Sequence, residues 1–252
     1  PPSSGALKIL NFGEGLENSG LDLKAEKSWN KEIGIRGDLS LIDYEIAGFH
    51  IDIENLVAAG RGTAFKNLGK VNSQGVEVRT DFLFSKVNKF IPNFGLAYTY
   101  LSTEIVDGTI ISNVQPVGQE VSINGNKLPY SPDHTLNVGM ELNPISSFLF
   151  RLDFKHVSKV YTDFQNLENE DDKVGYNLGI SGPIPAYNIL NLSSSYQMSK
   201  AMKLFLSGKN ILDTKYIGSR LHSNPGQKDA NISSGILPGP RRQINLGIEY
   251  NF

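Results

Sequence analysis

Hydrophobic and polar residues alternate with a period of two along most of the chain, and helical periodicity is almost absent. The clearest stretch lies between Val71 and Phe84. One face of this stretch carries Val76, Val78, Thr80, Phe82 and Phe84, and the other carries Glu77, Arg79 and Asp81. The alternation predicts nine strands, at residues 29–39, 44–53, 71–84, 93–103, 134–142, 148–157, 188–198, 203–212 and 243–252.

Alternation alone fits two architectures. In a soluble β-sandwich the polar face of each strand meets water, whereas in a membrane barrel the apolar face meets lipid and the polar face lines an interior. We expect each strand to present one such apolar face. In the second strand the alternation puts Ala47, Phe49, Ile51 and Ile53 on one face.

Strand length and connection length separate the two architectures. The predicted strands are longer than the roughly 5 to 6 residues typical of globular proteins. Every second connection is a short turn, at residues 40–43, 85–92, 143–147 and 199–202, and the others are long, at residues 54–70, 104–133, 158–187 and 213–242. Short turns on one rim and long loops on the other are typical of outer-membrane barrels. The sequence therefore predicts an all-β fold, an antiparallel transmembrane β-barrel.

Aromatic residues near the predicted strand ends support a membrane location, because aromatic side chains gather at membrane interfaces. They are Trp29, Tyr44, Phe84, Phe94, Tyr100, Phe148, Tyr196, Tyr250 and Phe252. Nine strands would leave two open edges, which lipid does not tolerate because their backbone groups would lack hydrogen-bond partners. We therefore expect this chain to be part of a larger barrel.

Composition narrows the chemistry. The 252-residue chain has no cysteine and a net charge of −2, so neither a disulfide scaffold nor a nucleic-acid partner is expected. Its four histidines show no HExxH spacing, and no G-x-S-x-G is present. We expect no catalytic residue, no metal site and no cofactor, and hence no enzyme.

Several motifs in order along the chain resemble TonB-dependent outer-membrane receptors. They are LDLKAEKSWNKEIGIRG from Leu21, YEIAGFHIDIENLV from Tyr44, NLGKVNSQGVEVRTDF from Asn67 and SGKNILDTKYIGSR from Ser207. Three further stretches, KLPYSPDHTLNVGM, SGPIPAYNILNLSSSY and GILPGPRRQINLGIEYNF, resemble the branch of this family that takes up ferric citrate.

The resemblance implies a 22-stranded barrel whose final nine strands lie in this chain. Residues 1–28 would form an extracellular loop that leads into the barrel, and residues 29–252 would form the C-terminal part of its wall. It further implies import of a ferric chelate such as ferric citrate or another siderophore, driven by the TonB complex through a plug domain absent from this chain. Tyr250 and Phe252 would signal to the barrel-assembly machinery, and the protein would sit among outer-membrane lipid.

Candidate ligand-binding residues lie in the long connections. The last one, through residue 243, carries five basic and two acidic residues, and the connection at 54–70 has a net charge of +2. Arginine binds carboxylates through two parallel hydrogen bonds, which suits an anionic ferric chelate. We select Arg61, Arg220 and Asn231 as candidates.

Two alternatives remain open. The chain could be a self-contained small outer-membrane barrel, a hydrolase or an adhesin, with residues 6–12 (ALKILNF) as a tenth strand that closes the sheet. It could also be a soluble β-sandwich that acts as a binding module.

Overall fold

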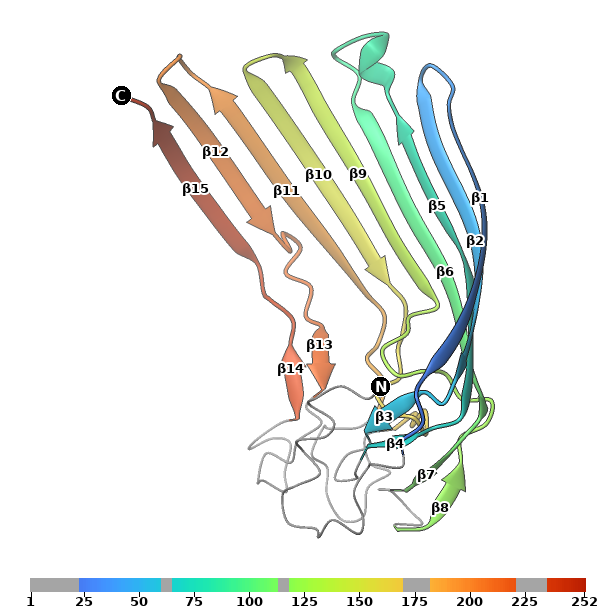
Figure 1. Ribbon diagram of the computed structural model, residues 1–252. Coiled ribbons are helices and arrows are strands. Elements are labelled where there is room, and N and C mark those ends of the chain that lie inside the picture. Colours follow the sequence, from blue (N-terminus) through green and yellow to red (C-terminus); the bar gives the residue numbers. More distant parts are fainter. Residues whose placement is uncertain (1–22, 60–64, 113–117, 170–181, 221–234) are drawn as a thin grey trace.

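The computed structural model describes residues 23–59, 65–112, 118–169, 182–220 and 235–252. Its main feature is one antiparallel sheet of nine strands (Figure 1). In sheet order these are β1 (Lys27–Asp38), β2 (Ile42–Glu54), β5 (Lys70–Phe82), β6 (Asn93–Asp107), β9 (His134–Ile145), β10 (Phe148–Val157), β11 (Tyr187–Gln197), β12 (Met202–Lys209) and β15 (Gln243–Tyr250). All nine predicted strands are confirmed, with shifts of a few residues at their ends.

The connections separate by length onto the two ends of the sheet. The tight turns lie together at one end, and one of them holds a short 3-10 turn, Phe84–Lys86 (Figure 1). The long connections lie at the other end, where they form three small hairpins. These are β3 (Val57–Ala59) with β4 (Phe65–Asn67), β7 (Thr109–Ile111) with β8 (Glu120–Ser122), and β13 (Ile217–Arg220) with β14 (Ile236–Pro238). The two ends are called the turn end and the loop end below.

Strand register joins the apolar positions of neighbouring strands into continuous rows. One such row crosses seven strands and consists of Phe82, Phe94, Met140, Leu152, Leu192, Gly208 and Ile244. Directly paired residues of antiparallel strands point to the same face, so this row belongs to one side of the sheet. We call this side the apolar face. Many of its side chains are solvent-exposed, for example Ile33 at 81% and Leu246 at 80%.

The opposite side, here called the polar face, carries charged residues in rows of its own. One row runs through Arg36, Glu45, Arg79, Ala97, Asn137 and Lys155, and the next through Asp38, Asp43, Asp81, Gly95, Gly139, Asp153 and Asn191. Two ion pairs form on this face, Arg79 with Asp81 and Arg151 with Glu141. A soluble protein would bury the apolar face and expose the polar one, but here the apolar face has no second layer among the described residues.

The register changes the interpretation of β2. Phe49, Ile51 and Ile53 do share a face, but their strand partners place them on the polar face, and Tyr44 and Ile46 occupy the apolar face instead. The apolar residues of the polar face have a local cause. Ile53, Val71 and Ile105 are directly paired near the loop end, where the connections pack over them.

Near the loop end, the residues on the apolar face change from apolar to polar. Lys31, His50, Gln74 and Ser102 form a polar row directly beyond the apolar row of Ile33, Gly48, Val76 and Tyr100. In β10 and β11 the change comes at His156 and Asn188, which are paired with each other. A surface that is apolar along most of its length and polar beyond a boundary is what a bilayer edge requires.

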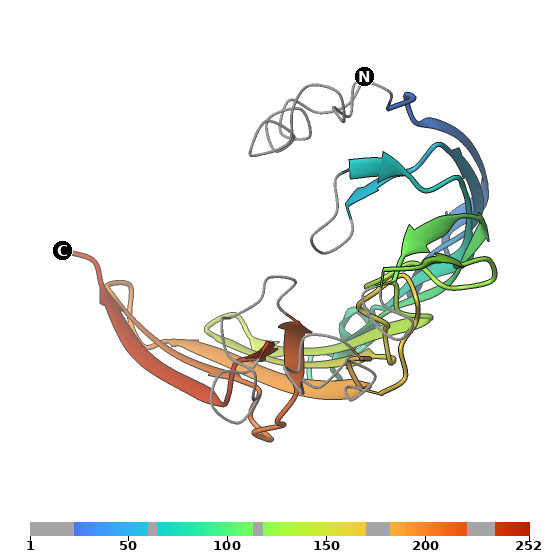
Figure 2. The same cartoon turned by 90° about the horizontal axis from the view of Figure 1, so that it is seen from below.

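The sheet bends into an open arc (Figure 2). The β3–β4 hairpin lies on its concave side in this view, and the loop residues that pack on the sheet contact the polar face. The polar face is therefore concave, as expected for a barrel lumen, and the apolar face is convex. The soluble β-sandwich is wrong, because the long strands form a single sheet rather than two packed ones.

The arc does not close within the described residues. β1 pairs only with β2, and β15 pairs only with β12, so one edge of each strand is open. Residues 6–12, the tenth strand of the small-barrel alternative, lie outside the described residues.

Aromatic side chains gather at the turn end of the convex face. Phe82 stacks on Phe84 at 5.9 Å between ring centroids, and Phe84 meets Phe94 edge-on at 6.4 Å. Tyr250 meets Phe252 edge-on at 5.1 Å. This grouping agrees with an interfacial girdle at the membrane edge.

We expect Ile46→Arg to destabilise the folded barrel by about 2–4 kcal/mol, because Ile46 lies within the apolar band of the convex face. Ala47→Arg, one residue further along β2, places the same group on the concave polar face and should cost much less. Urea unfolding of the full-length protein in lipid vesicles would measure both changes. Equal losses of stability would contradict the assignment of the two faces.

Candidate functional site

The long connections at the loop end share a hydrophobic core. Leu68, Val71, Ile105 and Ile123 are buried there, with Ile105 fully inaccessible. Ile53, Leu56, Ile110, Leu128 and Phe164 pack around them. Ile53, Val71 and Ile105 belong to the strands, whereas Leu68, Ile123 and Phe164 come from three different connections. The described parts of these three connections therefore form one layer on the sheet.

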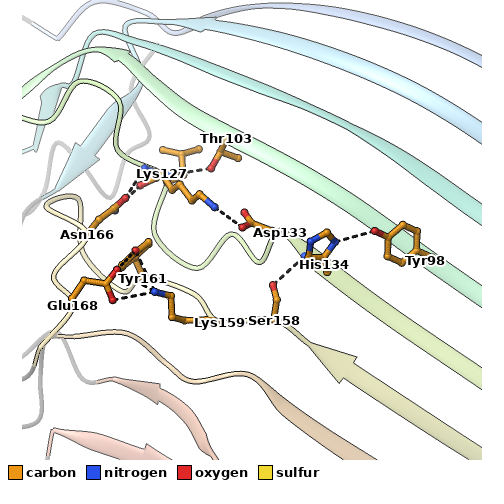
Figure 3. A network of polar contacts seen from close by, with 11 residues as sticks. Tyr98, Thr103, Lys127, Asp133, His134, Ser158, Lys159, Tyr161, Asn166 and Glu168 are labelled. Carbon is orange, nitrogen blue, oxygen red and sulfur yellow. Dashed lines mark hydrogen bonds and ion pairs between the residues drawn. The ribbon is translucent and has the colours of Figure 1, made fainter.

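Hydrogen bonds between the connections strengthen this layer (Figure 3). Asn166 and Lys127 bond twice: the Lys127 amide donates to Asn166 Oδ1 at 2.7 Å, and Asn166 Nδ2 donates to the Lys127 carbonyl at 2.9 Å. The Leu128 amide donates to Thr103 Oγ1 at 3.1 Å, and the Lys127 ammonium pairs with Asp133. The connections β6–β9 and β10–β11 are thus joined by both polar and apolar contacts.

An exposed cluster lies on the same layer. The Tyr161 hydroxyl donates to Glu168, and Lys159 Nζ reaches both Glu168 oxygens at 3.1 and 3.0 Å (Figure 3). The Tyr161 hydrogen bond, followed by that of Lys159, lowers the pKa of Glu168, and the Glu168 hydrogen bond raises the pKa of Lys159. Solvent screens such a pair, so it contributes little to stability.

Arg220, one of the predicted ligand-binding residues, is buried at 3% exposure. Its Nη2 donates to the Pro183 carbonyl at 2.8 Å, and its amide donates to the Tyr130 hydroxyl at 3.2 Å. The Tyr130 hydroxyl in turn donates to the Arg220 carbonyl at 3.1 Å, and the Tyr130 amide donates to the Tyr161 carbonyl at 2.8 Å. Arg220 and Tyr130 thus tie three connections together. Arg61 and Asn231, the other two predicted residues, lie outside the described residues.

Tyr130 holds an uncommon backbone conformation, with φ at 58°. For a bulky residue this region costs on the order of 1–3 kcal/mol and persists only where the surroundings enforce it. The hydrogen bonds to Tyr161 and Arg220 are such surroundings. The contacts of Tyr130 with Tyr161 and Arg220, called the Tyr130 joint below, therefore hold the three connections in a defined arrangement.

A second cluster lies at the base of the last long connection. Arg241 binds Asp213 with two hydrogen bonds, Nε to Oδ1 at 2.8 Å and Nη2 to Oδ2 at 2.5 Å, and the Arg242 amide donates to Asp213 Oδ1 at 3.1 Å. The Arg241 hydrogen bonds, followed by the backbone bond from Arg242, hold the pKa of Asp213 well below its usual range. Asn210 joins the same base, because its Nδ2 donates to the Thr214 and Pro240 carbonyls at 2.9 and 3.0 Å. We call this arrangement the basal clasp.

The basal clasp positions an aromatic and basic surface at the loop end, which is called the mouth below. Tyr216 stacks on Tyr187 at 4.5 Å between ring centroids. Next to Tyr216 lies a cavity of about 300 Å³, lined by Pro185, Ala186, Lys215, Tyr216 and Ile217. In the described part of the chain, the side chains of Lys215 and Arg242 form no ion pair. These two cations are the residues best placed to attract an anionic ligand.

Sequence analysis missed most of this arrangement. The sequence showed the net positive charge of the last connection. It did not show which of its basic side chains are free of acidic partners and able to bind a ligand. Asp213 neutralises Arg241 from 28 residues away, and Arg220 is buried, so Lys215 and Arg242 remain among the described residues of this connection. Within the described residues, no group of three or more His, Cys, Asp or Glu side chains is arranged to hold a metal ion. No helix among the described residues is long and apolar enough to cross a membrane.

Residues 6–211 match the family described as TonB dependent receptor-like, beta-barrel, so the chain belongs to this family. The family consists of outer-membrane transporters, not enzymes, which confirms the expected location and the expected absence of catalysis.

Solved structures agree with the fold. The chain is similar to the ferric citrate transporter FecA in its unliganded form (TM-score 0.68, 22% identity, 88% of this chain and 30% of that one) and to the ferric yersiniabactin uptake receptor FyuA from Yersinia pestis (TM-score 0.65, 18% identity, 90% and 30%). It is also similar to the copper transporter OprC (TM-score 0.68, 13% identity, 100% and 35%). The chain thus spans about a third of the length of these proteins, and at such identities they show the fold alone.

We expect Tyr130→Phe to loosen all three connections at once, because the hydroxyl carries both hydrogen bonds to Arg220. Hydrogen exchange of the full-length protein should rise in 158–169, 182–186 and 217–220 but not in the strands. Tyr196→Phe, at the turn end, is the matched control. A rise confined to the neighbours of residue 130 would contradict the Tyr130 joint.

The basal clasp should withstand mild acid. Since the folded pKa of Asp213 lies below its unfolded value of about 3.9, its stabilising effect is complete above that pH and is lost only as pH falls through the lower folded pKa. The difference in thermal unfolding between the native protein and Asp213→Asn should therefore be the same at pH 7 and at pH 4.5. A difference that vanishes at pH 4.5 would contradict this assignment.

Proposed function

We propose that this chain is the C-terminal part of the barrel wall of a receptor that imports an anionic ferric chelate, such as ferric citrate or another siderophore. Membership of the TonB-dependent receptor family is the observation that carries this proposal. The concave polar face and the layered loops at one end support it, since import needs a hydrophilic interior and an outward-facing mouth.

The charge at the mouth favours an anionic cargo. Lys215 and Arg242 lie at the loop end, and their side chains form no ion pair among the described residues. Carboxylate or other oxygen groups of a chelate would bind such cations by charge-assisted hydrogen bonds. A bare metal ion would instead require clustered ligands, and the described part of the chain offers no such cluster. Arg61 and Asn231 stay proposed contacts, and Arg220 is proposed to act by positioning the loops.

The remaining parts of the proposed receptor would lie outside this chain. The remaining strands would bring the wall to the proposed 22, with residues 1–28 as a loop that leads into β1. An upstream plug would receive energy from the TonB complex. The exposed terminal pair, Tyr250 and Phe252, lies at the turn end, beside the open edge of β15. We propose that the barrel-assembly machinery binds this strand.

Uptake of radioactive ferric citrate by cells tests the proposal. We expect the double variant Lys215→Gln with Arg242→Gln to lose about a hundredfold or more in affinity, because each of the two charge-assisted hydrogen bonds contributes about 1.5–3 kcal/mol. Lys200→Gln, a charge removed at the turn end, is the matched control.

Uptake should also stop in cells that lack TonB. Uptake that continues without TonB would contradict TonB-driven import. Equal affinity in the double variant and the control would remove the basic mouth from the ligand site.

A further inference from the structure

The convex face carries a groove that the import function does not use. It is a cavity of about 490 Å³ over β1, β2, β5 and β6, near the loop end. Gly48 forms its floor, and a Cβ added there would meet nothing nearer than the Gly75 carbonyl oxygen at 4.0 Å. The groove exists because a glycine interrupts the apolar row between Ile33 and Val76.

The groove has two chemically different halves. The half toward the turn end is lined by Ile33, Val76 and Tyr100. The half toward the loop end is lined by Lys31, His50 and Gln74, which are direct strand partners in one row. The boundary between the halves coincides with the polarity change on the convex face, so the groove lies at the edge of the apolar band.

The polar half offers donors and a positive charge. Lys31 forms no ion pair within the described residues. His50 lies 3.0 Å from Asp52 Oδ2 through Nε2, and its Nδ1 lies 3.4 Å from Gln74 Oε1. Asp52 is therefore bonded to His50, and the Gln74 amide keeps at least one N–H donor for a ligand.

We propose that this groove binds one phosphate-bearing lipid of the outer leaflet. An acyl chain lies over Gly48 between Ile33 and Tyr100, and the phosphate meets the Lys31 ammonium and the Gln74 amide. The order of apolar and cationic groups along the strands matches the order of acyl chain and phosphate in such a lipid. The groove is on the face opposite the lumen, so the transported ligand does not compete for it.

The test uses the full-length receptor purified in mild detergent and incubated with bisphosphorylated lipid A. Native mass spectrometry counts the bound lipid. We expect Lys31→Gln to lower lipid binding about fivefold, since one basic residue near an anionic membrane surface contributes about 1 kcal/mol. Gly48→Phe fills the groove and should lower binding at least as much. Lys155→Gln removes the same charge from the concave face and should leave binding unchanged.

Two further measurements show whether the groove binds a phosphate-bearing lipid or free phosphate. Lipid A without phosphates should bind the native receptor as weakly as bisphosphorylated lipid A binds Lys31→Gln. Inorganic phosphate should not displace the bound lipid from the native receptor. Displacement by inorganic phosphate together with indifference to Gly48→Phe would assign a free-phosphate site and overturn the lipid proposal.

Equal lipid binding in Lys31→Gln, Gly48→Phe and Lys155→Gln would also overturn it. If Gly48→Phe fails to assemble, Gly48→Ala adds a side chain into open space and should give a smaller loss in the same direction. The proposal rests on the outer-membrane location and not on the cargo. The lipid-binding test therefore gives a clear result even if the receptor does not import a ferric chelate.

Discussion

Backbone hydrogen bonding between strands in a fixed register is the interaction on which the rest of this structure depends. In lipid, every backbone N–H and C=O must find a partner within the protein, and only a closed sheet does this with strands. Because side chains alternate with a period of two, a slip of one residue between any two strands would exchange the faces of all strands beyond it. The apolar rows that cross the sheet show that the register holds through the body of the sheet. The register shifts between its strands lie at strand ends, between Phe148 and Phe150 in β10 and between Lys70 and Val71 in β5.

The same register explains what happens at the loop end. Once the strands pass the apolar band, the convex face meets water and becomes polar, as at His50 and Gln74. The concave face no longer borders an open lumen there and becomes apolar, as at Val71 and Ile105, which the connections cover. One set of strands thus serves as membrane wall along most of its length and as the base of the loop layer at its end.

The sequence alone predicted the strands well, because long alternating segments leave few other readings. It also predicted which connections are short, and its motifs indicated the TonB-dependent receptor family. It placed Phe49 and Ile51 on one face correctly. Local alternation does not tell whether that face is the convex or the concave one, because this depends on the distant strand partners Gly75 and Ser73. The burial of Arg220, with its hydrogen bonds to Pro183 and Tyr130, also has no local sequence signal. The partner of Asp213 is 28 residues away, and no local pattern shows such a contact.

The central claim is that the convex face meets lipid up to the row of His50 and Gln74 and meets water beyond it. Since the chain has no cysteine, single cysteines can be introduced one at a time along β5 and spin-labelled in lipid vesicles. Collisions with oxygen report lipid, and collisions with a water-soluble nickel complex report water. Our account predicts oxygen access at residues 76, 78 and 80, water access at 77, 79 and 81, and a change to water access at 72 and 74. Lipid access at 72 and 74, or no alternation between 76 and 81, would contradict it.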